Sequence, residues 1–526
     1  MTENHSISRD GSQDEAQTNT TLQLEIIYLD LNFDSDLPQP SPYSRPDIPP
    51  PNLSKLTSPY DWSPAQKSVV LAVSCTSTCF ASFAASCYSP GVEQMASEWN
   101  IGEVACLVGI TTFCCGFAVG PMFLAPFSEI TGRKPVFVAT AILLAICQLC
   151  CAVTRLYSGM LVARLFAGVG GSTFSTMVGG IIADICMPKN RNMPMALFSV
   201  AAIFGTGLGP LVCGFIAEYT TWRWIFYIQI IIAGMITLAV IFLFRETRGL
   251  VILRAKAKKL NEWYDALEAS GCYGVRFPTE EKSVRIRWRI AGDEERAGLS
   301  EMLWTSTTRP FHLLFTEPVV FFFSLWAAFS WSVLYINLSV IPLIFQEHYG
   351  FSLSESDSVF TATCVGSLLA MTISIVQDNL ASRRKGWNSV PEHRLYFSCL
   401  QSILLPIGLF LFGWTSQFYV HWIVPAIAVA IATMGIFSIY LAVFNYLADT
   451  YHRYASSALA AQSFCRNMMG GVFPLVSKQL FTNLKFGPAA SLLGGIGAAL
   501  TLVPWLLVFF GPKIRRASKF ASEAMD

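Results

Sequence analysis

The chain has 526 residues, of which 53% are hydrophobic and 13% charged, and its mean hydropathy of +0.47 is too high for an ordinary soluble protein. The formal net charge of +1 argues against nucleic acid as a partner, because phosphate binding requires a concentrated basic surface. The composition therefore indicates a protein embedded in a lipid bilayer.

The first 66 residues are polar, acidic and rich in proline, and we expect residues 1–66 to form a disordered cytosolic tail. Twelve apolar runs follow, each close to the ~20 residues with which a helix crosses a bilayer. They lie near residues 68–89, 102–124, 135–153, 157–184, 195–217, 223–244, 318–344, 356–377, 396–414, 420–447, 455–478 and 487–510. The prediction is an all-α membrane protein with six-helix bundles at 67–244 and 316–511, a cytosolic linker at 245–315 and a cytosolic tail at 512–526.

The positions of the basic residues predict that both termini are cytosolic. With this orientation, 26 of the 36 Lys and Arg residues lie in the cytosolic loops, the linker and the C-terminal tail. Basic residues are retained on the cytosolic side of a membrane, so this distribution favours the orientation. The basic residues left outside are Arg155, Arg223, Lys478 and Lys485.

Within the linker, residues 250–269 predict an amphipathic helix. Leucines and a tryptophan recur at helical spacing among basic residues, at Leu250, Leu253, Leu260, Trp263 and Leu267. Two interpretations remain open: the helix lies on the inner leaflet of the membrane, or it is solvated and braces the two halves.

The loop between the second and third runs combines an acid, a glycine and two bases in the strip GPMFLAPFSEITGRKP (120–135). Gly132 permits a tight reversal, while the two bases that follow keep the loop on the cytosolic side. Glu129 and Arg133 can bond to neighbouring helix ends, and Asp184 is a natural partner for Arg133. If the bond between Arg133 and Asp184 forms in one conformational state and breaks in another, the loop acts as a latch. The alternative is that the charges of the loop serve only as a signal that fixes the topology of the chain in the membrane. The candidate latch residues are Gly120, Glu129, Gly132, Arg133 and Lys134.

This strip resembles the loop signature of the major facilitator superfamily, in the form found in fungal drug:proton antiporters with twelve spans. Over about residues 60–520 the chain is similar to such proteins. LVARLFAGVGGS (161–172) resembles the fourth-span motif with its intramembrane arginine, here Arg164, and GTGLGPLVCGF (205–215) resembles the fifth-span antiporter motif. The resemblance implies a role of Arg164 in proton coupling and a multi-pass efflux pump for drugs or secondary metabolites. The basic loop at 383–385 lacks Gly-Arg-Lys, so a second latch is not expected there.

In the fifth run, Gly205 and Gly209 stand four residues apart on one face, a spacing that allows two helices to touch backbone to backbone. Pro210 removes one helical hydrogen bond and favours a kink. The resemblance implies a sealed, bendable contact between the two halves that favours exchange; the alternative is ordinary helix packing. The residues of this motif are Gly205, Gly207, Gly209, Pro210 and Gly214.

Two arginines lie at membrane depth, Arg164 in the fourth run and Arg466 in the eleventh. Each costs about 2.5–3.5 kcal/mol on insertion scales, so both should face the bundle interior and have a partner. Two roles are open for Arg164: it takes part in proton coupling, or it pairs with backbone carbonyls. Arg466 either lines the substrate cavity or takes part in coupling, or it makes a structural pairing. No acid occupies the middle of any run. The proton carrier is therefore expected in a polar network around Arg164 or among the acids near run ends, Glu93, Glu103, Asp184, Glu218, Glu317, Glu347, Asp357, Asp378 and Asp449.

Aromatic and amide side chains of the seventh and tenth runs predict the substrate cavity. Large flat rings with a few hydrogen-bonding tips suit bulky, partly aromatic solutes rather than ions. The candidates are Trp326, Trp331, Tyr335, Asn337, Tyr440, Asn445 and Tyr446. Most of the 15 cysteines lie inside apolar runs and are interpreted as small hydrophobic residues, so we expect no metal site.

We therefore expect a transporter and not an enzyme, since no nucleophile–base pair or metal-ligand spacing is present. No ATP-binding glycine loop occurs, so no cofactor is expected and the proton gradient is the expected driving force. The expected partners are a hydrophobic or amphipathic small molecule, protons and the lipid bilayer. The carrier is expected to be a monomer in the plasma membrane, with the vacuolar membrane as the alternative. Two other functions remain open: uptake or exchange of a nutrient or polyamine, and a transporter-like receptor that does not transport.

Overall fold

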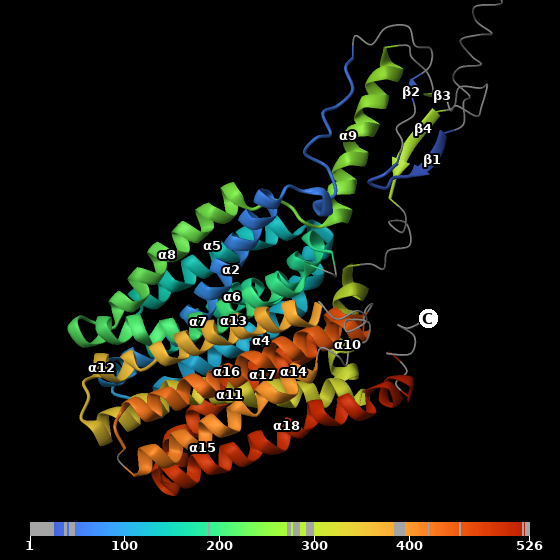
Figure 1. Cartoon of the computed structure of the whole chain (residues 1–526). Coiled ribbons are helices and arrows are strands. Elements are labelled where there is room, and N and C mark those ends of the chain that lie inside the picture. Colours follow the sequence, from blue (N-terminus) through green and yellow to red (C-terminus); the bar gives the residue numbers. More distant parts are fainter. Residues whose placement is uncertain are drawn as a thin grey trace, which may run out of the picture. The chain divides into compact units, whose positions relative to one another are not determined.

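The computed structural model describes residues 26–35, 39–40, 48–187, 190–270, 275–276, 285–290, 299–382, 395–418, 420–451, 454–517 and 520. The chain divides into two compact units (Figure 1). The large unit contains Ser63–Arg245 and Leu299–Asp526, and the small unit contains Met1–Trp62 and Glu246–Gly298. The N-terminal tail and most of the predicted linker therefore belong together, whereas residues 299–315 of that linker belong to the helical unit. The basic loop at 383–385 lies outside the described residues.

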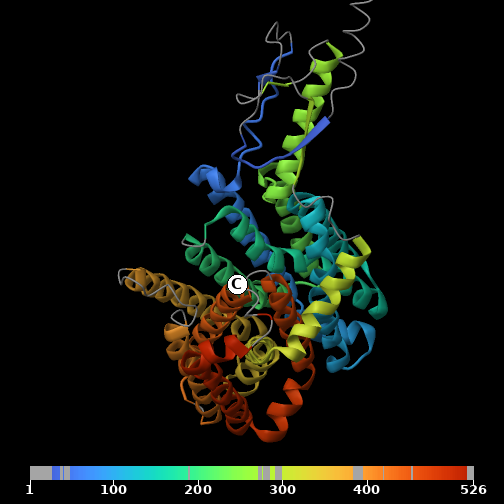
Figure 2. The same cartoon turned by 90° about the vertical axis from the view of Figure 1, so that its right-hand side faces the viewer.

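Long apolar helices build the large unit. Its first half contains α2 (Pro64–Ser86), α3 (Val92–Trp99), α4 (Glu103–Thr131), α5 (Arg133–Val153), α6 (Tyr157–Ile185), α7 (Asn192–Tyr219) and α8 (Arg223–Leu243). Its second half contains α10 (Leu299–Thr316), α11 (Pro318–Tyr349), α12 (Leu353–Ser358), α13 (Thr361–Ser382), α14 (Leu395–Ser402), α15 (Leu404–Gln417), α16 (Ile423–Tyr451), α17 (Ala455–Leu484) and α18 (Phe486–Ala517). Figure 2 shows the blue-to-green helices of the first half and the orange-to-red helices of the second half as two groups.

Eleven helical segments of the described residues are long and apolar enough to cross a membrane, six in the first half and five in the second. Each coincides with one of the twelve predicted runs. The remaining run is α17, a continuous helix of 30 residues that falls short of the same test. Gln462, Arg466 and Asn467 lie buried in its middle and lower its hydropathy. All twelve predicted helices are thus present, and one of them has a polar centre.

Local sequence explains where the helices begin and reverse. Ser63 and Gln66 form a capping box at the start of α2, and a proline occupies the first helical position. Gly132 has a φ of 107° and separates α4 from α5. This φ lies in the left-handed region that favours glycine, so the predicted tight reversal at Gly132 is confirmed.

Two helices of the first half carry most of the contact with the second half. α4 packs along α17, while α7 packs along α13 and α12. The large unit has two ends, which we name by their residues: the Glu103 end, where α4 begins, and the Arg133 end, where α5 begins. Under the predicted topology the Arg133 end faces the cytosol.

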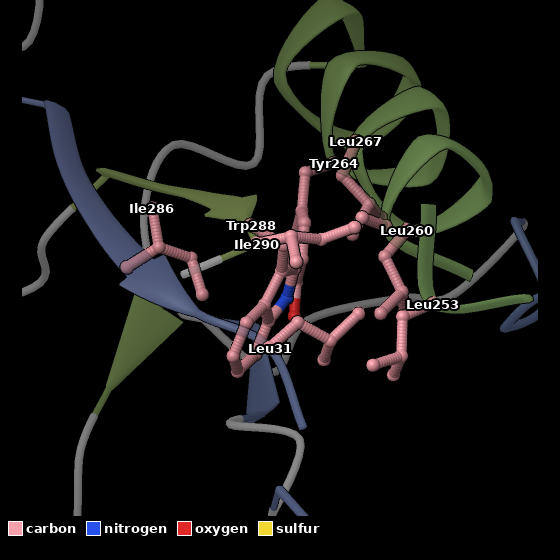
Figure 3. Packing of buried hydrophobic residues seen from close by; sticks show 9 residues of the cluster. Leu31, Leu253, Leu260, Tyr264, Leu267, Ile286, Trp288 and Ile290 are labelled. Atoms are coloured by element: carbon pink, nitrogen blue, oxygen red, sulfur yellow. The ribbon is translucent and has the colours of Figure 1, made fainter. Parts of the chain in front are cut away.

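The small unit is an α/β arrangement that composition did not predict. β1 (Ile26–Asp30) pairs in parallel with β4 (Arg285–Arg289), and β2 (Gln39–Pro40) pairs antiparallel with β3 (Val275–Arg276). α9 (Gly249–Ala269) supplies the third element. A hydrophobic cluster unites them (Figure 3), formed by Leu31, Leu253, Ala257, Leu260, Tyr264, Leu267, Ile286, Trp288 and Ile290. The expectation of disorder across residues 1–66 is therefore wrong for β1, because its pairing partner lies in the linker.

The same cluster argues against the inner-leaflet interpretation of the linker helix, while the bracing of the two halves stays a prediction. The segment 250–269 forms α9 as a helix, but its leucine face packs against β4 and the segment after β1. That face is covered by protein, so it is not available to a lipid surface. Ion pairs also join α9 to β4: Glu268 lies 2.7 Å from Arg285 and 2.9 Å from Arg287. Burial alone would raise the pKa of Glu268, but the hydrogen bonds from these two arginines outweigh it and lower the pKa to about 2.

Candidate functional site

Arg466 lies in the middle of α17 with 1% of its surface exposed. Its guanidinium carbon Cζ is 4.5 Å from the centre of the Trp331 ring and 5.0 Å from the centre of the Tyr440 ring. The two rings are stacked, with centroids 5.3 Å apart and planes inclined by 27°. α11, α16 and α17 thus bring three of the predicted site residues together around one buried positive charge.

The polar atoms of this group lack partners. Nε and Nη1 of Arg466, Nε1 of Trp331 and Oη of Tyr440 have no hydrogen-bond partner among the described residues. The same is true of both amide atoms of Gln462, which precedes Arg466 by one helical turn. We call these four residues the Arg466 cluster. An unsatisfied buried polar group costs about 1–3 kcal/mol, so several of them gathered in one place are typical of a binding site.

The Arg466 cluster lies where the two halves of the large unit meet. The ring of Phe198 on α7, in the first half, has its centroid 6.2 Å from that of Tyr440. Tyr335, one turn after Trp331 on α11, interacts with the thiol of Cys114 on α4. Helices of both halves therefore contribute side chains beside the cluster.

The predicted cavity residues are only partly brought together. Tyr446 packs on Phe323, with ring centroids 5.1 Å apart, and Trp326 packs on the same ring at 5.9 Å. Asn337 is buried on α11 and Asn445 is half-buried on α16. No ring contact or hydrogen bond between described residues connects these two amides with the Arg466 cluster, so Trp331, Tyr335 and Tyr440 are the predicted cavity residues that the structure groups around it.

Arg164 on α6 is fully buried and donates to main-chain carbonyls. Its Nε donates to Gly109 at 3.2 Å, its Nη1 to Ala84 at 2.8 Å and its Nη2 to Ala85 at 3.2 Å. The guanidinium carbon also lies 4.4 Å from the centre of the Phe113 ring. The structure thus contains the carbonyl pairing that was one of the two alternatives for Arg164, and this pairing joins α6 to α4 and α2.

The predicted partner of Arg133 is in place. Nε of Arg133 is 3.4 Å from Oδ2 of Asp184, and Nη1 donates to Oγ of Ser128 at 2.8 Å. Glu129 lies at 3.9 Å, and the arginine is only 5% exposed. Lys134, by contrast, donates to a main-chain carbonyl of α8. The loop residues therefore tie the Arg133 ends of α4, α5, α6 and α8 together.

Three predicted glycines pack within the first half. Gly205 and Gly209, the pair at four-residue spacing, face the main chain of α2 at Cys79 and the side chain of Ser86, with no room for a Cβ atom. Gly120 faces α6 in the same way, where Oγ of Ser172 lies 2.5 Å from the position of a Cβ atom. For these three positions the structure matches ordinary close packing of helices within one bundle.

The other two glycines of the fifth-span motif face the second half. A Cβ atom on Gly207 would lie 3.0 Å from the side chain of Thr363 on α13, and one on Gly214 would lie 2.5 Å from Oδ2 of Asp357 on α12. α7 continues as a helix through Pro210 to its end at Tyr219. The contact between halves that the motif implied is therefore made by Gly207 and Gly214.

Asp357 is the acid that sequence reasoning could not single out from the nine near span ends. It is 1% exposed, and its Oδ2 has no hydrogen-bond partner among the described residues. The acids and thiols that face it come from α7, where Glu218 accepts a hydrogen bond from the main-chain N–H of Ser354 at 2.5 Å and Cys213 lies nearby. Asp357 is distinguished from the other acids near span ends by the packing of α12 against the glycines of α7. No local sequence pattern predicts this packing.

Polar contacts also join the halves at the Glu103 end. Nζ of Lys478 on α17 is 2.6 Å from Oε2 of Glu103 on α4. Oγ of Ser89 donates to the carbonyl of Leu338 on α11 at 2.8 Å.

Within the described residues, no group of three or more His, Cys, Asp or Glu side chains could hold a metal ion. The large unit therefore combines a buried basic and aromatic cluster with polar contacts between its halves at the Glu103 end.

Comparison with solved structures identifies the architecture. The xylose transporter XylE from E. coli, in a partially occluded inward-open conformation, matches with a TM-score of 0.57 and 15% sequence identity, over 84% of this chain and 98% of that chain. A POT family transporter in complex with a peptide conjugate matches with a TM-score of 0.56 and 11% identity, over 84% of this chain and 96% of that chain. At such identities the likeness concerns the fold alone.

Comparison of sequences identifies the family. The transporter paaT of Penicillium rubens is 34% identical over 470 residues, covering 88% of this chain and 82% of its own length. The multidrug transporter FLR2 of Candida glabrata is 30% identical over 89% of this chain and 77% of its own length. The efflux pump radE of Floropilus chiversii is 29% identical over 95% of this chain and 89% of its own length. The family model of the Major Facilitator Superfamily matches residues 74–474. The chain therefore belongs to the major facilitator superfamily, a family of transporters and not of enzymes.

Proposed function

We propose that this chain is a secondary active transporter that exports a small organic molecule from the cytosol across the plasma membrane. The observation that carries the proposal is the Arg466 cluster, where unpartnered polar atoms and stacked rings lie between the two halves. Rings supply contact area for an apolar, partly aromatic solute, and the polar tips orient it. A site in this position is offered to one side of the membrane and then to the other when the halves rock.

The contacts at the Glu103 end support alternating access. The Glu103–Lys478 ion pair and the Ser89 hydrogen bond join the halves there. An exposed ion pair contributes only about 0.2–1 kcal/mol, so such contacts can break in each transport cycle. Under the predicted topology, this end opens outward when the solute is released.

Proton coupling is the proposed source of energy, and we assign Asp357 as the candidate proton carrier. Its carboxyl group lies against Gly214 on the surface where the halves touch, so parting the halves changes its access to water. A group whose surroundings differ between two states can bind a proton in one and release it in the other. Arg164, held by three carbonyls of α2 and α4, positions the helices of the first half in this scheme.

Export is favoured over the alternatives by the relatives, which are named multidrug transporters and efflux pumps. Exchange of a polyamine would call for carboxylates at the solute site, whereas the central charges of the described helices are Arg164 and Arg466. We further propose that the carrier works as a monomer, because each chain contains both halves.

Cellular retention tests the proposal. The chain is expressed in a yeast strain that lacks its own pumps, and the cells are loaded with dyes, fungicides and fungal metabolites, with and without a protonophore. We expect lower retention of some compounds than in cells with empty vector, and the protonophore and the variant Trp331→Ala should both abolish the difference.

The other outcomes select among the alternatives. Higher accumulation of a compound would replace export by uptake. Export that persists after the pH gradient collapses would reject proton coupling while leaving the carrier intact. An unchanged panel, with the protein present at the cell surface, would reject export of these compound classes and favour the receptor.

A further inference from the structure

We propose that the exported solute is an organic anion, and that the Arg466 cluster recognises its carboxylate while the rings of Trp331 and Tyr440 hold a flat, apolar body. The inference rests on the proposed transport function and names its substrate class. It is carried by the charge balance at the centre of the large unit and by the donors that remain unpartnered there.

The centre of the large unit carries positive charge without a countercharge. Arg164 and Arg466 are both buried, and no carboxylate among the described residues forms an ion pair with either. Both arginines act on the same surroundings, since each lies close enough to Tyr335 and Cys114 to influence them. A buried charge is costly unless it is paired, so this centre favours a ligand that brings a negative charge.

The two arginines differ in what their donors do. Each of the three guanidinium nitrogens of Arg164 donates a hydrogen bond to a main-chain carbonyl. Nε and Nη1 of Arg466 are buried and have no partner among the described residues. Its guanidinium group lies over two ring faces, which attract the cation but accept no conventional hydrogen bond. Arg466 is therefore the group with free capacity for a carboxylate, whose planar oxygens match a guanidinium.

The surroundings of Arg466 define the rest of the solute. Trp331 and Tyr440 form a stacked pair, so a flat ring suits the apolar part better than a flexible chain. Nε1 of Trp331, Oη of Tyr440 and the amide of Gln462 add further unpartnered polar atoms. Carboxylate recognition uses the donors among them, and a hydroxyl or carbonyl on the same solute can use the rest. A cationic solute would be repelled at this position by Arg466.

Paired probes separate charge from shape. The purified full-length protein is reconstituted in liposomes at pH 7.5, and transport of 2-naphthoate is compared with that of 2-naphthamide, which has the same ring but no charge. Protein-free liposomes give the passive leak of each probe. We expect the wild type to prefer the acid. Arg466→Gln should raise the KM for the acid by about 10- to 100-fold, the effect of losing a charge-assisted pair, and leave the KM for the amide within about threefold.

Two further variants serve as controls. Arg155→Gln removes a positive charge from an exposed position and should change neither KM. Arg466→Lys keeps the charge without the planar fork and should recover part of the preference for the acid. Transport of the amide by Arg466→Gln shows that this variant is folded. If that variant cannot be recovered, Trp331→Phe and Tyr440→Phe keep a ring, remove one unpartnered polar atom each, and should raise the KM for the acid by about 3- to 10-fold.

Each outcome bears on the inference. Equal transport of acid and amide that Arg466→Gln leaves unchanged would overturn anion recognition while the carrier function stands. A preference for the acid that both Gln variants abolish alike would assign it to surface charge and also overturn the inference. Failure of the wild type to move either probe, in liposomes where another compound is exported, would overturn the flat carboxylate as the solute; failure with every compound would overturn the transport function itself.

Discussion

A Cβ atom placed on Gly214 of α7 would lie 2.5 Å from Oδ2 of Asp357 on α12, closer than real side chains approach. The main chain of the first half therefore touches a buried carboxyl group of the second half with no side chain between them. Glu218, one turn further along α7, holds the main-chain N–H of Ser354 in the same contact. The close contact between α7 and α12 thus depends on residue 214 being glycine.

Gly214→Ala tests this dependence. The added methyl group must push α12 away from α7, and overpacking of this kind costs about 1–3 kcal/mol. We expect a lower thermal unfolding temperature of the purified full-length protein and a transport rate reduced by about tenfold, because the closed state is disfavoured.

Gly234→Ala on α8 is the matched control, since nothing lies within 4 Å of the position of its Cβ atom. Alanine is the better helix former by up to about 1 kcal/mol, so this variant should be as stable as the wild type or more stable. Equal losses in both variants would contradict a specific contact at Gly214.

Asp357→Asn tests the proton carrier. The amide keeps the size of the side chain but does not switch between a protonated and an ionised form, so an imposed pH gradient should no longer drive accumulation of solute in proteoliposomes. Movement of solute down its own gradient should continue, because the solute site is unchanged. Accumulation that remains at the wild-type level would remove Asp357 from the coupling mechanism.

The control for this variant is Glu347→Gln. Glu347 is an exposed acid close to the end of α11 that lies at the Glu103 end. Its replacement removes one carboxylate without touching the contact between the halves. We therefore expect accumulation driven by the pH gradient to remain unchanged, and a similar loss in both variants would point to surface charge.

The features that could be predicted from sequence are those set by local pattern. Apolar runs of membrane length predicted the helices. Because successive spans end on alternating sides of the membrane, the sequence also predicted that Arg133 lies near Asp184, as the structure confirms. Asp357 could not be chosen, because its burial depends on which helix packs against α12. The small unit was missed for the same reason: Arg289 of β4 binds Asp30 of β1 across 259 residues of sequence. Relations of this kind leave no periodic signal.

The Arg466 cluster shows the same limit at the functional site. The arginine and the rings were identifiable as candidates from their membrane depth and residue type. Their distances and the absence of partners for their donors come from the packing of α11, α16 and α17. Asn337 and Asn445 fitted the same sequence criteria, yet no hydrogen bond between the described residues links them with the cluster, so residue type alone did not delimit the site.

Arg133→Lys tests the latch. Arg133 is nearly buried and holds Asp184 and Ser128 with different nitrogens, which a lysine cannot do from a single ammonium group. We expect a fall in the unfolding temperature and a transport rate reduced several-fold. Lys134→Arg is the matched exchange at the neighbouring position and should have little effect, because an arginine keeps the positive charge and can also donate to the main-chain carbonyl of Ile241. A larger effect of Lys134→Arg would contradict a latch centred on Arg133.

Glu268 makes the small unit sensitive to acid. Its pKa is lowered from the ordinary 4.5 to about 2 because hydrogen bonds from Arg287 and Arg285 outweigh the effect of burial. A carboxyl group with a lowered pKa in the folded state contributes stability above its unfolded pKa and loses it as the pH falls towards the folded pKa.

Hydrogen exchange of α9 and β4 in the full-length protein, corrected for intrinsic rates, should therefore show constant protection above about pH 5 and declining protection between about pH 4.5 and 2. Glu268→Gln should reduce protection at pH 6 and flatten the decline, whereas Glu262→Gln, which removes an exposed partner of Lys258 at 3.9 Å, should leave both unchanged. Protection that does not vary with pH in the wild type would show that this carboxylate does not stabilise the unit.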